Sequence, residues 1–236
     1  MTTDVFKGKV HESWLPLFQS PLGELYINTL KKIVYNHPTK DKEGFNISKE
    51  LGFKLLPRLQ DILHPFRCVD LNNIKVVILF DQPMENIGAT GIPLDLIEGI
   101  PRLRTNILDL FESTYQIYTN NPFTTFDLNS WMDQGVLLIN AIMTREMVNV
   151  TNHLEYWEEF TQLLINKLYS INNNILFVSI GNKIHDIQFP KKAKVIYTPL
   201  GVCNTDIERA IFHKYKLFDK INQELKTIDE SISISW

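Results

Sequence analysis

The chain has 236 residues, of which 44% are hydrophobic and 22% charged, and its formal net charge is -3 at pH 7. This composition is that of an ordinary globular protein and is large enough for one good-sized domain, which we place over residues 1–236. The slight acidity argues against a protein whose affinity for nucleic acid depends on wholesale neutralisation of phosphates, although it is compatible with a local basic groove.

The cysteine pattern and the lack of long apolar runs indicate the cellular compartment in which the protein is expected. Cys68 and Cys203 form neither a metal-binding spacing nor a disulfide framework, so we expect no metal site, no cofactor and an intracellular, reducing compartment, cytoplasm or nucleus. The N-terminus has no apolar signal segment, and no apolar run reaches membrane-spanning length. We therefore expect no export and no membrane insertion.

Apolar periodicity predicts helices and strands in alternation along the chain. After bulky apolar residues at 10–18, it indicates helices at about 25–34, Ser48–Leu63, Leu103–Tyr118, His153–Tyr169 and Asp206–Leu225. Short, continuously apolar runs predict buried strands at Lys75–Phe80, Val136–Asn140, Ile175–Gly181 and Lys194–Thr198. Polar, glycine-rich or proline-rich segments at 36–44 and 87–94 are expected to be loops.

This alternation predicts an α/β protein: one domain with a central, mostly parallel four-stranded sheet flanked by helices. In such sheets the carboxyl ends of the strands meet at one edge, where ligands bind. The residues at the carboxyl ends of the predicted strands should therefore lie together at that edge. They are Asp81, Gln82, Asn140, Gly181, Asn182, Pro199 and Leu200.

Residues Trp131 to Asn140 read W-M-D-Q-G-V-L-L-I-N, which resembles the W-x-x-Q-G-V-L-L-L-N motif of the uracil-DNA glycosylase family. Thr144 supplies the threonine that follows this motif in the family. Further segments that resemble the family are His11–Pro16, Lys75–Leu79, His153–Thr161, Phe177–Asn182, Phe212–Phe218 and, as a shorter match to poxvirus members, Thr90–Leu94. The resemblance covers most of the chain. It implies the family's fold and DNA as a partner.

The catalytic motifs depart from the family's pattern. Where the family has G-Q-D-P-Y, this chain reads F-D-Q-P-M, so Gln82 stands at the aspartate position and Asp81 precedes it. Where the family has H-P-S-P-L, the chain has Thr198–Pro199–Leu200 and lacks the histidine. The phenylalanine that stacks on the flipped base in the family corresponds to Leu94. Recognition residues are therefore kept better than catalytic ones.

The resemblance assigns residues to a base pocket and to DNA contacts. Asn140 suits the edge of uracil because an amide offers both a donor and an acceptor. Leu200, held by Pro199, corresponds to the wedge that helps a base to leave the stack. The implied base pocket is Gln82, Pro83, Met84, Leu94 and Asn140. The implied DNA contacts are Pro101, Arg102, Gly181, Asn182, Pro199 and Leu200.

Several of these residues have an ordinary structural interpretation as well. Asp81 is either a displaced catalytic carboxylate or a loop aspartate that is solvated or holds neighbouring amides, and the order of residues favours the loop aspartate. Asn140 either reads a base or satisfies backbone groups at a strand end. Leu200 is either a wedge or core. His153 is interpreted as a structural residue, and His64 is set aside as a replacement donor because it lies too early in the chain.

Three functions remain open on the sequence. The first is a uracil-DNA glycosylase-like protein with eroded catalytic motifs, which binds DNA, including uracil-containing DNA, or a protein partner, with weak or no base excision. Poxvirus relatives imply such a partner, since they serve a polymerase processivity complex. The second is an active glycosylase of base-excision repair that uses Asp81. The third is a protein-interaction module that no longer binds DNA. The oligomeric state is left open.

Overall fold

The computed structural model describes residues 5–36, 55–99, 106–146, 153–181, 187–198 and 205–236. The strands are β1 (Leu55–Leu56), β2 (Val76–Phe80), β3 (Val136–Asn140), β4 (Arg145–Glu146), β5 (Leu176–Ile180) and β6 (Lys194–Tyr197). The α-helices are α1 (Leu15–Phe18), α2 (Pro21–Asn36), α4 (His64–Cys68), α5 (Asn106–Thr119), α6 (Leu128–Asp133), α7 (Leu154–Ile171), α8 (Asp206–Lys214) and α9 (Leu217–Ile228). Short 3-10 turns cover Glu12–Trp14 (η1), Leu59–Asp61 (η2) and Leu71–Asn73 (η3).

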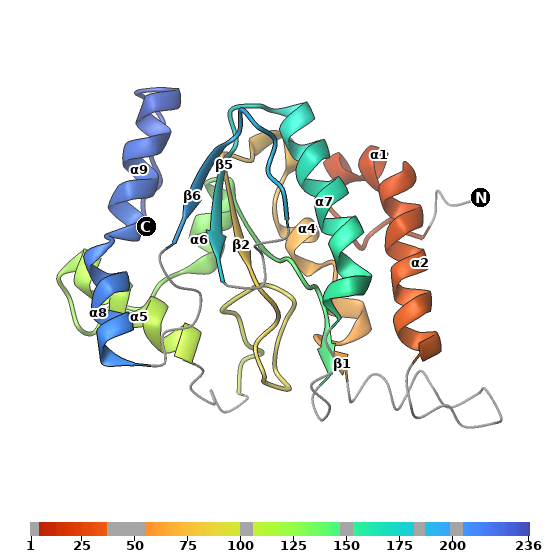
Figure 1. Ribbon diagram of the computed structural model, residues 1–236, viewed down its shortest axis with the longest axis horizontal. Helices are drawn as coiled ribbons and strands as arrows, with labels where there is room; N and C mark the ends of the chain where they lie inside the picture. Colours follow the sequence, from red (N-terminus) through yellow and green to blue (C-terminus); the bar gives the residue numbers. More distant parts are fainter. Residues whose placement is uncertain (1–4, 37–54, 100–105, 147–152, 182–186, 199–204) are drawn as a thin grey trace.

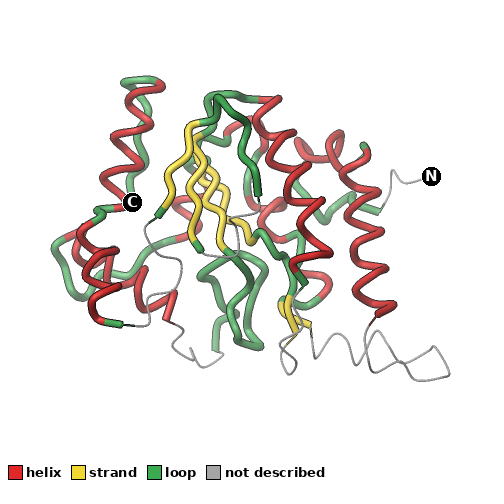
Figure 2. The backbone as a smooth tube through the Cα atoms, viewed as in Figure 1, coloured by secondary structure: helices red, strands yellow, loops and turns green. Residues whose placement is uncertain are grey.

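A four-stranded sheet in the order β3-β2-β5-β6 forms the centre of the molecule, and all its neighbouring strands are parallel. Helices lie on both sides of it: α7, α2 and α1 on one side, and α5, α8 and α9 on the other (Figure 1; Figure 2). Helix α7 packs against α2. This arrangement confirms the predicted α/β fold with a parallel sheet and flanking helices.

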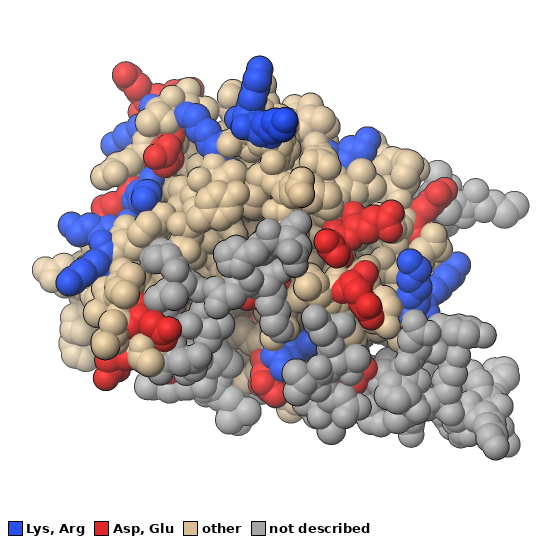
Figure 3. Space-filling view, viewed as in Figure 1, with Lys and Arg blue, Asp and Glu red and all other residues tan. Residues whose placement is uncertain are grey.

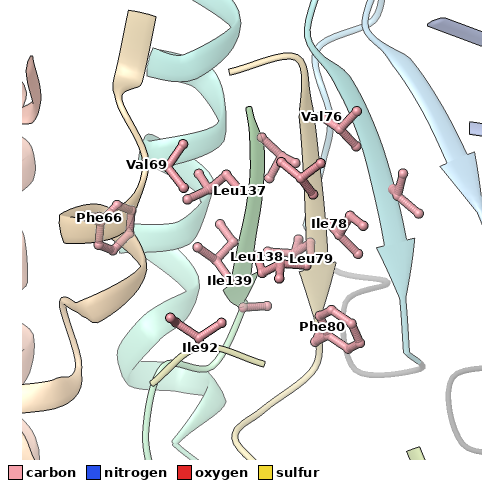
Figure 4. Close-up of a cluster of buried hydrophobic side chains, with 14 of the residues drawn as sticks. Phe66, Val69, Val76, Ile78, Leu79, Phe80, Ile92, Leu137, Leu138 and Ile139 are labelled. Atoms are coloured by element: carbon pink, nitrogen blue, oxygen red, sulfur yellow. The ribbon is translucent and has the colours of Figure 1, made fainter. Parts of the chain in front are cut away.

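Burial on both faces explains why β2, β3 and β5 are almost entirely apolar. Every residue of β2, β3 and β5 is buried. Figure 4 shows Leu137 and Ile139 of β3 together with Phe66 and Val69 from the region of α4. Burying one such side chain fully contributes about 1.5–3 kcal/mol. The core thereby fixes the positions of the strand ends, on which the candidate site is built.

The predicted helix at Ser48–Leu63 is wrong over residues 55–63, the part that the structure describes. Leu55 and Leu56 form β1, which pairs antiparallel with β4, and the short turn η2 follows. Pro57 is the physical reason: it lacks an N–H donor and favours an extended conformation for the residue before it. The apolar pattern of this segment therefore reflects burial and not a helical face.

The predicted last helix, Asp206–Leu225, is two helices. α8 ends before Lys216, which takes a left-handed conformation with φ 51°, and α9 begins at Leu217. The break allows Leu217 and Phe218 to be buried at the start of α9. Because apolar spacing continues across the break, sequence periodicity did not reveal it.

The charged side chains on the face shown in Figure 3 are of both signs and interspersed. Within the described ranges, no helix is long and apolar enough to span a bilayer.

Candidate functional site

Three parallel strands end side by side at the edge where a ligand site was predicted. Phe80, the last residue of β2, is in register with Asn140 of β3 and with Ile180 of β5. The ladder continues one step further, because the Ile142 N–H donates to the Asp81 carbonyl at 2.9 Å. Asp81, Asn140 and Gly181 are thus brought together by the sheet.

Asn140 carries an unsatisfied polar atom. The whole Asn140 residue is only 5% exposed. Its side-chain Oδ1 atom is buried and has no hydrogen-bond partner in the described part of the chain. Leaving a buried acceptor unpaired costs about 1–3 kcal/mol. This oxygen therefore accepts no hydrogen bond from a backbone N–H group of the described residues. A ligand that offers an N–H donor would satisfy the oxygen.

The Asp81 carboxylate lies over Gly181. A Cβ atom placed on Gly181 would be 2.1 Å from the Asp81 Cγ and Oδ1 atoms and 2.4 Å from Oδ2. Gly181 also has φ +137°, a backbone conformation that side chains disfavour. Its lack of a side chain therefore makes room for the carboxylate. The carboxylate sits at the end of β5, whereas Asn140 ends β3, the other neighbour of β2.

The other predicted pocket residues follow β2 in a largely buried loop. Gln82 is half-buried. Pro83 is buried, and Met84 and Leu94 both belong to the hydrophobic core. Leu94 has φ 68°, which is rare for a bulky residue. Leu94, expected at the base-stacking position, is thus packed among apolar side chains.

This loop is pinned by short-range and long-range contacts. Thr90 Oγ1 donates to Asp95 Oδ2 at 2.7 Å, and Gly91 lies against the carbonyl of Asp61. The His64 ring approaches the same loop, with its Nδ1 atom 3.0 Å from the Thr90 carbonyl oxygen. Distance along the chain had set His64 aside. Its position depends on where α4 begins, which Pro65 in the first turn of that helix indicates.

Helix α7 supports the segment that follows Asn140. The Thr161 hydroxyl donates to the Ala141 carbonyl at 2.6 Å, and Trp157 Nε1 donates to Thr144 Oγ1 at 2.7 Å. His153 Nδ1 is 2.9 Å from the same Thr144 oxygen, in a fully buried cluster that is consistent with the structural role expected for His153. From the sequence, Thr161 was named only as the end of a segment that resembles the family, and no role was assigned to it.

Five predicted contact residues lie outside the described residues: Pro101, Arg102, Asn182, Pro199 and Leu200. Thr198, just before two of them, donates through its backbone N–H and its hydroxyl to the Ser179 carbonyl, at 3.1 and 3.0 Å. The described ranges contain no group of three or more His, Cys, Asp or Glu side chains arranged to hold a metal ion.

Comparison with known proteins finds individual relatives and a solved structure that resemble the chain. No family profile matches the chain. The uracil-DNA glycosylase of Campylobacter jejuni (strain 81-176) is 24% identical over 240 residues, covering 100% of this chain and 97% of that protein. The uracil-DNA glycosylase of Idiomarina loihiensis is 31% identical over 129 residues, 53% of this chain and 59% of that protein. The crystal structure of mimivirus uracil-DNA glycosylase shares the fold, with a TM-score of 0.65, 20% identity and coverage of 96% and 94%.

Proposed function

Because the chain is a divergent member of the uracil-DNA glycosylase family, we propose that it binds DNA and holds a uracil base against Asn140, with weak or no excision of that base. The observation that carries this proposal is the buried, unpaired Oδ1 atom of Asn140 at the carboxyl edge of the sheet. The reading edge of uracil presents an N–H group between two carbonyl oxygens. An amide oxygen fixed by a rigid strand is a suitable acceptor for that group.

Excision would need charged groups that the chain lacks at the matching positions. Breaking the bond between base and sugar builds positive charge on the sugar and negative charge on the departing base. Gln82 cannot supply the negative charge, and the motif at Thr198–Pro199–Leu200 has no imidazole. Losing one preorganised donor typically costs about 2.7–4 kcal/mol of barrier. Loss of a carboxylate in addition to such a donor makes slow or absent excision the physical expectation.

The alternative function is active excision with Asp81 as the carboxylate. Asp81 lies over Gly181, at the end of β5, and Asn140 ends the strand on the other side of β2. One nucleotide would have to place its base against Asn140 and its sugar against Asp81, and so span the distance between these two positions. This separation supports the first proposal over the alternative.

The test uses single-stranded oligonucleotides that differ only in one uracil. Purified protein is incubated with the uracil strand, and abasic sites are detected as alkali-labile breaks. Binding to both strands is measured in parallel over a range of salt concentrations. We expect few or no breaks, salt-sensitive binding, and tighter binding of the uracil strand.

Two variants and a control make the result specific. Asn140→Ala should abolish the preference for uracil, whereas Asn129→Ala, an exposed asparagine on α6, should keep it. Robust cleavage that Asp81→Asn abolishes would establish the alternative. Equal binding of both strands that Asn140→Ala leaves unchanged would refute the base pocket. If the protein binds no DNA at all, both DNA-binding functions are rejected and the protein-interaction module is the function that remains.

A further inference from the structure

Two segments that leave neighbouring strands meet in an ion pair. Glu85, in the loop after β2, places Oε2 3.2 Å from Nη2 of Arg145, the first residue of β4. The two partners differ in burial, because the Arg145 side chain is 16% exposed and the Glu85 side chain is 64% exposed. Arg145 is therefore a cation held nearly in place, whereas the Glu85 carboxylate lies at the surface and can move away from Arg145.

The Arg145 guanidinium is only partly satisfied. Its Nε atom is buried and has no hydrogen-bond partner within the described ranges. Nε–H and one Nη–H of a guanidinium form a planar fork that fits two oxygens of one carboxylate or phosphate group. Glu85 makes the Nη2 contact, and the Nε donor remains without an acceptor. A buried donor in this state marks a place where an anion with two suitably spaced oxygens would bind better.

The pair lies at the same edge of the sheet as Asn140. Arg145 follows Asn140 by five positions, and Glu85 follows the end of β2. Arg145 is also paired with Leu56 of β1, and β1 lies beyond the ends toward which the strands of the sheet point (Figure 1). A nucleic-acid strand whose base reaches Asn140 would bring its phosphates to this edge.

We propose that the Arg145 fork is a phosphate-binding site for the DNA backbone, which Glu85 occupies in the free protein. This inference rests on the proposed function, since it names a contact for the same DNA. Phosphate displaces Glu85 because the exposed carboxylate gains little from a pair in water, while the fork gains its second hydrogen bond. Glu85 thus competes with DNA and lowers the affinity of the free protein.

A purely structural ion pair makes the opposite prediction. If the pair served only to hold the loop, Glu85→Gln would loosen the loop and would not improve binding of any anion. If Glu85 guards a phosphate site, Glu85→Gln tightens DNA binding several-fold. The sign of this change separates the two interpretations.

The first measurement is the affinity for single-stranded DNA as a function of salt. Arg145→Gln should weaken binding roughly tenfold at low salt, the factor expected from one charge-assisted hydrogen bond. It should also lower the slope of log affinity against log salt by about 0.7, the value for one phosphate of a single strand. Arg145→Lys should keep the slope and lose affinity, because it keeps the charge without the fork.

The control is Lys194→Gln, at the first residue of β6 and therefore at the opposite edge of the sheet. Lys194 Nζ contacts Thr227 Oγ1 at 2.6 Å, so this variant also loses a cation and a polar contact. Its affinity and slope should match those of the unmodified chain. Unchanged slope and affinity in Arg145→Gln, or unchanged or weaker binding in Glu85→Gln, would overturn the inference.

A second measurement does not depend on DNA. Inorganic phosphate, compared with chloride at equal ionic strength, should raise the thermal unfolding midpoint of the unmodified chain and of Glu85→Gln, but not that of Arg145→Gln. If the chain binds no DNA yet shows this pattern, the proposed function fails and the anion site stands. If it binds DNA and Arg145→Gln changes neither measurement, the anion site fails and the proposed function stands.

Discussion

The contact between Asp81 and Gly181 can be tested by adding a single methyl group. In Gly181→Ala the new Cβ would lie 2.1 Å from two atoms of the Asp81 carboxyl group, well inside van der Waals contact. The backbone at φ +137° adds strain that a glycine avoids. Both effects destabilise the folded protein, and they are separable because only the first involves Asp81.

The size of the destabilisation in Gly181→Ala can be estimated from the steric contact and the backbone strain. Holding alanine in a sparsely populated backbone region costs about 1–3 kcal/mol. Forcing the Asp81 side chain away from its preferred rotamer adds about 0.5–1.5 kcal/mol. Gly181→Ala should therefore lower the free energy of unfolding by about 1.5–4.5 kcal/mol. In an Asp81→Ala background only the backbone term should remain, so the coupling between the two sites should be about 1 kcal/mol.

Urea unfolding of the unmodified chain, the two single variants and the double variant gives this coupling directly. Gly8→Ala is a matched control, since Gly8 has φ +73° and nothing lies within 4 Å of its added Cβ. It should show backbone strain alone and no dependence on Asp81. If Gly181→Ala costs the same with and without Asp81, the carboxylate does not occupy the space above Gly181, and the position assigned to Asp81 is wrong.

Three further changes test the supports of the site, the proposed lack of a catalytic carboxylate and one pH dependence. Thr161→Val should cost about 1–3 kcal/mol in urea unfolding, because it leaves the buried Ala141 carbonyl unpaired, whereas Thr119→Val, whose hydroxyl contacts carbonyls of its own helix, should cost far less. Gln82→Asp should speed excision by roughly 10²-fold in the abasic-site assay if the missing carboxylate limits the reaction; no gain would place the limit elsewhere. Burial, with a smaller effect from Arg209, lowers the pKa of His213, so the unfolded chain binds this proton more readily. The free energy of unfolding should therefore fall as the pH drops below about 6.5, and less so in His213→Gln; equal pH profiles would refute the assignment.

The strands β2, β3 and β5 could be predicted because burial on both faces demands nearly uninterrupted apolar runs. Asn140 was found for the same reason, as the polar residue on which such a run ends. Its unpaired oxygen could not be predicted, because that depends on which groups of neighbouring segments come within hydrogen-bond distance. The strand at Leu55–Leu56 was missed for a related reason, since its partner β4 lies about 90 residues away.

The direction in which the Asp81 carboxylate points can be argued from the sequence and the structure together. In an extended chain, neighbouring side chains point to opposite sides, and the Asp81 carbonyl still takes part in the ladder beyond β2. We therefore expect a carboxylate at position 81 to face a different direction from one at position 82, which is the reason the proposed function gives Asp81 no catalytic role. In this chain it lies over Gly181, where only a residue without a side chain leaves room. Because this packing fixes Asp81, changing Gln82 alone restores a charge at the family's position without disturbing the contact, whereas recruiting Asp81 for catalysis would require the contact to break.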